Sequence, residues 1–136
     1  MRFRSKLVLA FCALSVLSRL RAEDKVAAGK YLVEEIAKCQ ECHTPRLESR
    51  EFDKTKWLKG AVMEYAPIKP VQGWHKTSPD LTPSGRLWSR WKEEALRKYL
   101  ETGIAPNGKP ADPPMPAYKM KKADAEAVVE YLKTLP

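Results

Sequence analysis

The sequence Cys39-Gln40-Glu41-Cys42-His43 places two thiols and an imidazole within five residues. A Cys-x-x-Cys-His sequence is the attachment site of a c-type haem, in which each thiol adds across one vinyl group of the same porphyrin. The adjacent imidazole then ligates the iron as the proximal ligand. Cys39, Cys42 and His43 are therefore predicted to hold one covalent haem c, with His43 bound to the metal.

Three other kinds of site use closely spaced cysteines. A thioredoxin-like dithiol follows a strand of a βαβ unit, and no run of β-branched residues precedes Cys39. A zinc site needs further ligands, but only His75 and no cysteine follows His43. A disulfide at this spacing closes so small a loop that it constrains the unfolded chain little. Haem attachment is favoured, and the dithiol is the main alternative.

The sixth iron ligand is predicted to be Met115, which follows two prolines and precedes a third. The prolines restrict the backbone around an otherwise flexible thioether, and His/Met ligation is an established arrangement at a haem iron. His75 would instead give a bis-His iron of lower potential, and Met63 and Met120 are positional rivals. A sixth position left open, as in a haem enzyme or a gas-binding sensor, is the remaining alternative.

The residues around the haem are less well determined by the sequence. The proximal imidazole is expected to donate its Nδ1–H to a backbone carbonyl or a water, which would fix the ring. An indole N–H or Arg86 could bind a propionate. The aromatic candidates for the pocket wall are Trp57, Trp74, Trp88 and Tyr65. Two fixed axial ligands would leave no position for a substrate, so the site predicts an electron carrier that catalyses no reaction itself.

Residues 1–22 have the pattern of a secretory signal peptide, with Arg2, Arg4 and Lys6 preceding an apolar run over residues 7–17. That run is shorter than the ~20 residues that span a bilayer. Cleavage is expected near Ala22, with a cut after Ser18 as an alternative. Two domains are thus predicted, a signal peptide (1–22) and a periplasmic haem domain (23–136).

The net charge of +8 comes largely from the predicted signal peptide. Five of the 25 basic residues lie in residues 1–22 together with no acidic residue, so 20 basic and 17 acidic residues remain and the balance falls to +3. This balance does not indicate a nucleic-acid partner. Cys12 also lies in the signal segment, so the remaining domain has only the two cysteines that the haem would use.

Three amphipathic helices must position the site, because apolar residues recur at spacings of three and four in residues 24–38, 89–102 and 123–135. Asp24 and Ser89 are the expected N-caps of the first two, and Gly103 ends the second. Gly29, in the first helix, suggests a close crossing by another helix. Residues 44–87 and 104–120 are rich in Pro and Gly and show no alternating strand pattern, and a haem would explain loops of this length.

Taken in their order along the chain, the helices, the Cys-x-x-Cys-His sequence and the Pro-Met-Pro loop resemble those of class I monohaem c-type cytochromes. More narrowly, they resemble the cytochrome c subunits of bacterial alcohol and related dehydrogenases. The sequences that carry the resemblance are Gly29-Lys30-Tyr31-Leu32, Cys42-His43-Thr44-Pro45, Ser78-Pro79-Asp80-Leu81-Thr82-Pro83, Leu100-Glu101-Thr102-Gly103, Pro114-Met115-Pro116 and Tyr131-Leu132. Asp80 stands where that group often has Asn, and residues 46–76 have no counterpart that aligns with it.

The resemblance implies an all-α cytochrome c fold, with three main helices and irregular loops wrapped around a covalent haem. It places the distal ligand on Met115. It also implies a redox protein as partner, which could be a dehydrogenase, a terminal oxidase or another cytochrome, and association with a membrane-bound complex. A free electron carrier and a haem subunit of a larger dehydrogenase complex both agree with this expectation.

Overall fold

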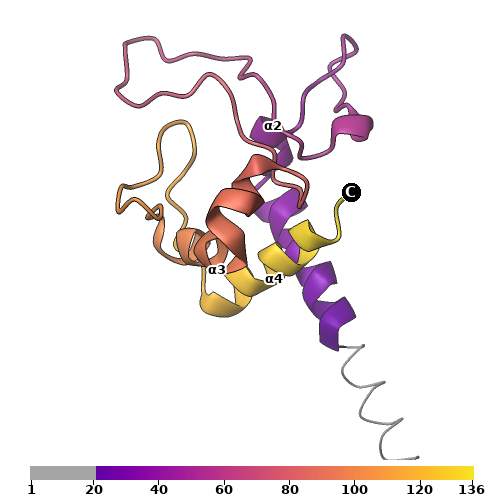
Figure 1. Ribbon diagram of the computed structural model, residues 1–136. Coiled ribbons are helices and arrows are strands. Elements are labelled where there is room, and N and C mark those ends of the chain that lie inside the picture. Colours follow the sequence, from indigo (N-terminus) through magenta and orange to yellow (C-terminus); the bar gives the residue numbers. More distant parts are fainter. Residues whose placement is uncertain (1–20) are drawn as a thin grey trace, which may run out of the picture.

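The structure is a computed structural model that describes residues 21–136. Residues 21–31 are α-helical and lead into a π-helical turn, η1 (Leu32–Ile36). The other elements are α2 (Gln40–His43), the 3-10 turn η2 (Lys54–Lys56), α3 (Arg86–Thr102) and α4 (Lys122–Lys133). Long irregular loops join them (Figure 1). No strand occurs within this described range, which confirms the all-α prediction.

The predicted signal peptide lies almost wholly outside the described residues, because the description starts at residue 21. Its cleavage and export therefore remain predictions. Among the helices of residues 21–136, none combines the length and the apolar character needed to cross a bilayer.

The N-terminal helix differs from its prediction at both ends. Residues 21–23 are already helical, so Asp24 lies within the helix and does not cap it. The last turn is the wider η1 turn, in which Val33 is fully buried while Ile36 is 59% exposed. A π-turn inserts an extra residue and so rotates the residues that follow it around the helix axis. The apolar spacing of residues 24–38 places Ile36 on the buried face together with Val33, and the π-turn turns it away from that face.

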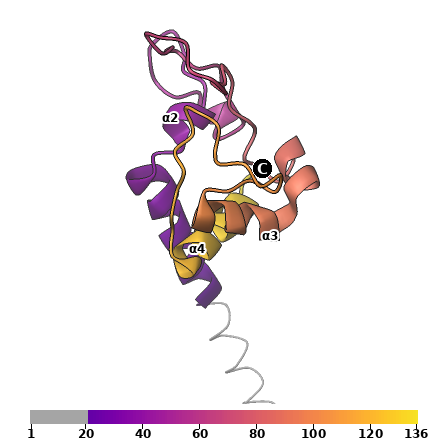
Figure 2. The same ribbon diagram turned by 90° about the vertical axis from the view of Figure 1, so that its left-hand side faces the viewer.

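The N-terminal helix and α4 cross at Gly29, as its sequence position suggested. A Cβ at Gly29 would lie 1.9 Å from the carbonyl oxygen of Ala127 and 2.9 Å from the Cβ of Tyr131. Only glycine allows the two backbones to approach so closely. The crossing is visible from two directions (Figure 1 and Figure 2), and the buried core around it comprises Val33, Leu58, Val128, Tyr131 and Leu132.

Helix α3 begins three residues before the expected cap. Gly85 occupies the N-cap position with extended backbone, and Ser89, the predicted cap, donates its hydroxyl hydrogen to the carbonyl of Arg86 inside the first turn. The predicted end is confirmed, because Gly103 is left-handed (φ 70°) and its N–H donates to Tyr99 O at 2.7 Å. The helix is kinked at Lys92, whose φ is 58°.

Isolated antiparallel bridges close the irregular loops. Arg46 pairs with Phe52, Val62 with Thr77, and Ile104 with Pro110. These pairings give each loop a narrow base without forming a sheet, so much of the loop backbone is hydrogen-bonded although it is irregular. Two of the loops, residues 46–52 and 62–77, lie at the same end of the molecule as α2 (Figure 1).

Candidate functional site

A cavity of about 550 Å³ lies between α2, α3, α4 and two of the loops. Cys39, Cys42, His43 and Met115, the four residues predicted to hold the haem, all line it. They come from segments more than 70 residues apart in the chain. Most of the wall is apolar, and its aliphatic and proline residues include Pro79, Leu81, Leu87, Leu96, Leu100, Pro110, Pro114, Val128 and Leu132.

His43 is the last residue of α2 and is only 4% exposed. Its Nδ1 lies 2.8 Å from the carbonyl oxygen of Pro79. A carbonyl can only accept, so Nδ1 carries the hydrogen and Nε2 keeps its lone pair for a metal. Burial lowers the pKa of His43 and the hydrogen bond to Pro79 partly opposes this, so the ring stays neutral, which is the form that ligates metals. Pro79 is the acceptor that the sequence could not identify.

Cys39 and Cys42 lie at the start of α2 and one turn into it, and both are free cysteines. Burial raises the pKa of the Cys39 thiol to about 11. Reactive dithiols have the opposite property, a lowered pKa that favours the thiolate. The thiol environment therefore argues against a dithiol oxidoreductase and agrees with cysteines that anchor a group by covalent bonds.

The loop that carries Met115 is held at several points. The Met115 N–H donates to Asp112 O at 3.1 Å, and the His75 N–H donates to Pro113 O at 2.8 Å. Further along, the Tyr118 hydroxyl donates to Ala37 O at 3.0 Å. The thioether is thus presented by backbone that is tied both to the 62–77 loop and to the N-terminal helix.

The structure sets one of the three rival ligands, Met120, apart from the cavity. Met120 packs against the buried core and does not line the cavity, whereas Met63 and His75 do line it. The His75 side chain is 61% exposed, and its Nε2 lies 3.3 Å from an oxygen of Asp112. Met115, His75 and Met63 thus remain together at one cavity.

The pocket wall differs from the expectation. Trp57, Trp74, Trp88, Tyr65 and Arg86 do not line the cavity. The indole of Trp88 donates to Leu81 O at 2.7 Å, and that of Trp57 donates to the Tyr131 hydroxyl at 3.4 Å. Trp74 packs edge to face on Tyr65, 5.7 Å between ring centroids. These indole rings therefore contact other parts of the chain outside the cavity.

Trp91 and Tyr99 of α3 line the cavity instead, as an edge-to-face pair 5.0 Å apart. Both lie on the apolar stripe of residues 89–102, which by itself indicates core packing, and this stripe is the signal that could have found them. Arg90 and Asn107 also line the cavity, and the sequence singled out neither. Both carry hydrogen-bond donors suited to a carboxylate.

The arrangement fits a c-type haem. The wall is mostly apolar, as a porphyrin requires, two cysteines stand beside a buried neutral imidazole, and a thioether and two polar donors reach the same cavity. The cavity volume also falls in the range of about 300–1,000 Å³ that is common for cofactor sites.

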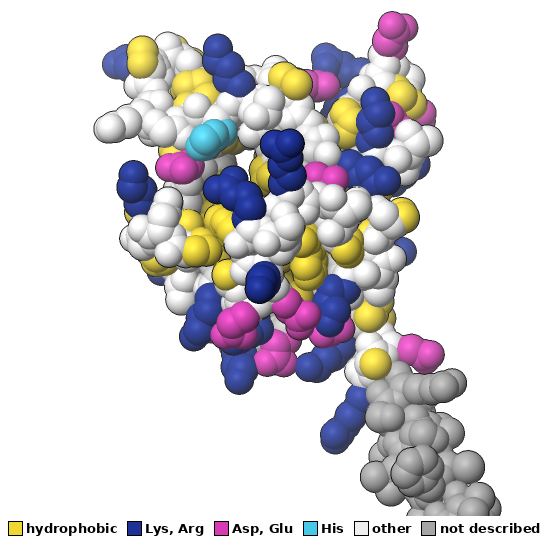
Figure 3. All heavy atoms as spheres, viewed as in Figure 1, with side chains coloured by type: hydrophobic (Ala, Val, Ile, Leu, Met, Phe, Trp, Pro, Cys, Tyr) yellow, Lys and Arg dark blue, Asp and Glu magenta, His cyan; other side chains and the backbone are white. Residues whose placement is uncertain are grey.

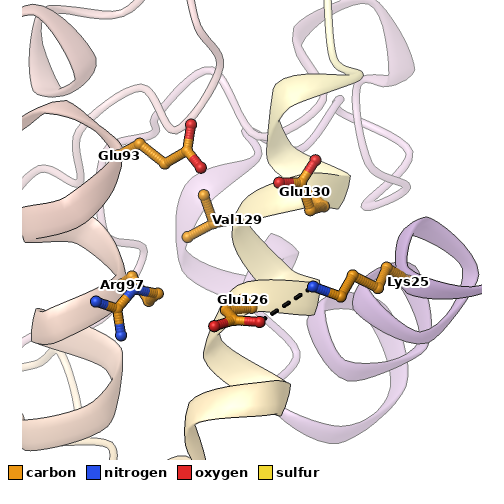
Figure 4. Close-up of a pocket in the computed structure, with 6 residues that line it drawn as sticks. All are labelled: Lys25, Glu93, Arg97, Glu126, Val129 and Glu130. Atoms are coloured by element: carbon orange, nitrogen blue, oxygen red, sulfur yellow. Dashed lines mark hydrogen bonds and ion pairs between the residues drawn. The ribbon is translucent and has the colours of Figure 1, made fainter. Parts of the chain in front are cut away.

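A second hollow, of about 290 Å³, lies between the N-terminal helix, α3 and α4 and is lined mostly by charged side chains (Figure 4). Lys25 binds Glu126 at 3.0 Å across it, and Lys133 binds Glu93 at 3.1 Å. Arg97 pairs with Glu94 and Glu101 on its own helix. Because the charges around it are paired in this way, the hollow is a place where ion pairs join neighbouring helices.

Comparisons with known proteins agree with this geometry. Residues 26–136 match the cytochrome c family. The chain is 34% identical, over 79% of its length, to a "Diheme cytochrome c-type" protein of Cereibacter sphaeroides, of which it covers 34%. It is 31% identical, also over 79%, to the "Fructose dehydrogenase cytochrome subunit" of Gluconobacter japonicus, of which it covers 21%.

A further similarity, 31% identity over 85% of the chain, is to the cytochrome c subunit of the quinone-type alcohol dehydrogenase of Gluconobacter oxydans, of which the chain covers 25%. The chain thus spans about a third or less of the length of these curated relatives.

Proposed function

Because this chain belongs to the cytochrome c family, we propose that it is a periplasmic electron carrier whose single covalent haem is held by Cys39 and Cys42 and ligated by His43 and Met115. One observation supports this most strongly. All four side chains line the same apolar cavity, and the hydrogen bond to Pro79 leaves Nε2 of His43 available to a metal. When bound, the haem supplies an iron that alternates between ferrous and ferric states.

The chain's own residues favour electron transfer because their contacts hold the two proposed axial ligands in fixed positions. The Pro79 carbonyl fixes the orientation of the His43 ring, and the hydrogen bonds of the Met115 loop restrict the thioether. The apolar wall excludes water and so favours the less charged, reduced form of the site. Two fixed ligands leave no position for a substrate, which agrees with a carrier that does not itself transform one.

Met115 is preferred to His75 as the distal ligand because the His75 side chain is mostly exposed and already has a partner, Asp112. The His75 imidazole contacts Asp112 and is mostly exposed, and its backbone N–H is bound to Pro113. To reach an iron in the cavity, it would have to give up the carboxylate and move inward. Met115 is on the cavity wall without such a competing partner among the described residues, and His/Met ligation is established for cytochromes c.

One haem is proposed because the sequence contains one Cys-x-x-Cys-His. A similar protein is named as a dihaem cytochrome, but this chain covers only 34% of that protein. Export to the periplasm is proposed from the signal pattern of residues 1–22. The two cysteines of residues 23–136 would both be used by the haem.

The proposed partner is a dehydrogenase, with a terminal oxidase or another cytochrome at the other end of the exchange. Support comes from relatives named as cytochrome subunits of fructose and alcohol dehydrogenases. Association with a membrane-bound complex belongs to the same proposal.

Haem attachment is tested by a pyridine haemochrome spectrum and a haem stain on a denaturing gel, applied to the exported protein. The wild type is expected to carry one haem that survives denaturation. A variant with Cys39→Ala and Cys42→Ala is expected to lose it and to be largely unfolded, because the helices then lose the group that fills their shared cavity. Met120→Leu, a core substitution away from the cavity, is the matched control and keeps the haem.

A stable, folded and haem-free cysteine variant would contradict the proposal. A reduced spectrum typical of five-coordinate iron in the wild type would point to the open-site haem enzyme or gas sensor instead.

A further inference from the structure

The 62–77 loop is a closed surface loop with a defined base. The Ser78 N–H donates to Ala61 O at 2.9 Å, and the Met63 N–H donates to Lys76 O at 2.8 Å. The Ser78 hydroxyl also donates to Cys42 O at 2.6 Å, which ties the base to α2. Loops of this kind, with closed ends, frequently carry function.

Large apolar side chains are exposed along this loop. Ile68 is fully exposed, and Val62, Tyr65 and Val71 are 71%, 53% and 43% exposed. Figure 3 shows hydrophobic side chains interspersed with basic ones at this end of the molecule. Single exposed apolar residues are normal, whereas an exposed apolar patch marks an interaction site, and these four residues all belong to one loop.

The positive charge of the domain is concentrated at the same end. Residues 46–77 contain seven basic and four acidic residues, whereas the rest of residues 23–136 contains thirteen of each. Within this segment, residues 62–77 carry a net charge of +1, from Lys69 and Lys76 against Glu64, and residues 53–61, around η2, carry the other +2. Such a surface attracts a partner that carries an excess of carboxylates.

The loop also reaches the candidate haem site. The hydroxyl of Tyr65 lies 3.7 Å from Sγ of Cys42, and Met63, His75 and Thr77 line the cavity. A protein that contacts the exposed side of Tyr65 would therefore be separated from the Cys42 sulfur by about that one side chain. A redox partner needs this kind of short approach, and a structural anchor does not.

We propose that the 62–77 loop is the docking surface for a redox partner protein whose contact face is an apolar patch ringed by carboxylates. This inference rests on the proposed electron-carrier function and names the surface through which it is exercised. Val62 and Ile68 supply the apolar contact, Lys69 and Lys76 meet the carboxylates, and Tyr65 connects the contact to Cys42.

The test uses the haem-loaded protein and a surface of the proposed chemistry, a gold electrode coated with mixed methyl- and carboxylate-terminated alkanethiols. Replacing Val62 and Ile68 together by Ser is expected to weaken adsorption about fivefold or more, as loss of two buried aliphatic contacts implies. Lys69→Glu is expected to weaken it as well, most strongly at low salt. The optical spectrum and the reduction by a small neutral mediator should not change in either variant.

The matched control replaces Tyr31 and Ile36 by Ser, since these residues of the N-terminal helix are 58% and 59% exposed. Equal adsorption by wild type and loop variants, or equal losses in loop and control variants, would overturn the proposal. So would a finding that the loop substitutions abolish binding to phosphatidylglycerol vesicles or self-association in sedimentation while leaving adsorption intact. A wild type that the mediator cannot reduce would instead refute the carrier function itself.

Discussion

The helix crossing at Gly29 leads to a prediction about stability. The structure decides whether an alanine at this position raises or lowers the free energy of unfolding. In Gly29→Ala, the added methyl group would lie 1.9 Å from the Ala127 carbonyl oxygen and 2.9 Å from the Tyr131 Cβ, whereas ordinary contacts are 3.4–4 Å. The nearest obstacle is backbone, which cannot rotate away, so the two helices must separate by more than about 1 Å.

Two effects compete in this substitution. Alanine is the better helix former by about 1 kcal/mol, while overpacking a tight contact costs about 1–3 kcal/mol. The severity of the clash at Gly29 places the cost at the upper end, since core packing around Val33 and Val128 is disturbed as well. The expected net loss is about 2 kcal/mol, which for a domain of this size lowers Tm by roughly 10 °C.

Unfolding of the haem-loaded protein by heat and by guanidinium, followed by circular dichroism at 222 nm, measures this loss. Ala28→Gly is the control, because Ala28 is exposed in the same helix and should lose only about 1 kcal/mol of helix propensity. A Gly29→Ala protein as stable as the wild type, or more stable, would refute the close crossing.

Three further predictions concern other contacts. Thr44→Val removes the hydroxyl that accepts the Leu58 N–H at 2.9 Å in a 2% exposed position, so denaturant unfolding should show a loss of about 1–3 kcal/mol. Burial raises the pKa of Tyr131 to about 12 from 10.0, so the unfolded state loses the phenolic proton first and the free energy of unfolding falls as pH rises from 10 towards 12. Tyr131→Phe should therefore show a smaller fall between pH 9 and 11 in urea titrations. Met115→Ala should abolish the near-infrared sulfur-to-iron band and lower the reduction potential, whereas His75→Ala should do neither; the reverse result would assign the ligand to His75.

Local sequence patterns predicted the features that depend on local chemistry. The haem-attachment pattern, the all-helical content and the glycine that ends α3 at Gly103 all required only neighbouring residues. Gly29 was informative for a related reason, since a glycine in a helix interior is costly unless a close approach needs it. The comparison with the cytochrome c family confirms the fold that these signals indicated.

The features that the sequence did not predict depend on contacts between distant segments. The wall was predicted to include Trp57 and Trp88, but their indoles are bound to Tyr131 and Leu81, and Trp91 of α3 lines the cavity instead. Ile36 left the buried face because of one π-turn, which no periodicity reveals. Pro79 became the partner of His43 through a contact across 36 residues.

The burial of Cys39 has a consequence for how this protein is made. In the folded chain without haem, burial raises the pKa of the Cys39 thiol to about 11, so at neutral pH this partly buried sulfur is protonated and is a poor nucleophile. A ligation enzyme needs access to that sulfur and to both vinyl groups of its substrate. We therefore expect the proposed thioether at Cys39 to form most readily while the chain is still open. Conditions that let the bare chain collapse early are then expected to lower the yield of holoprotein rather than its stability.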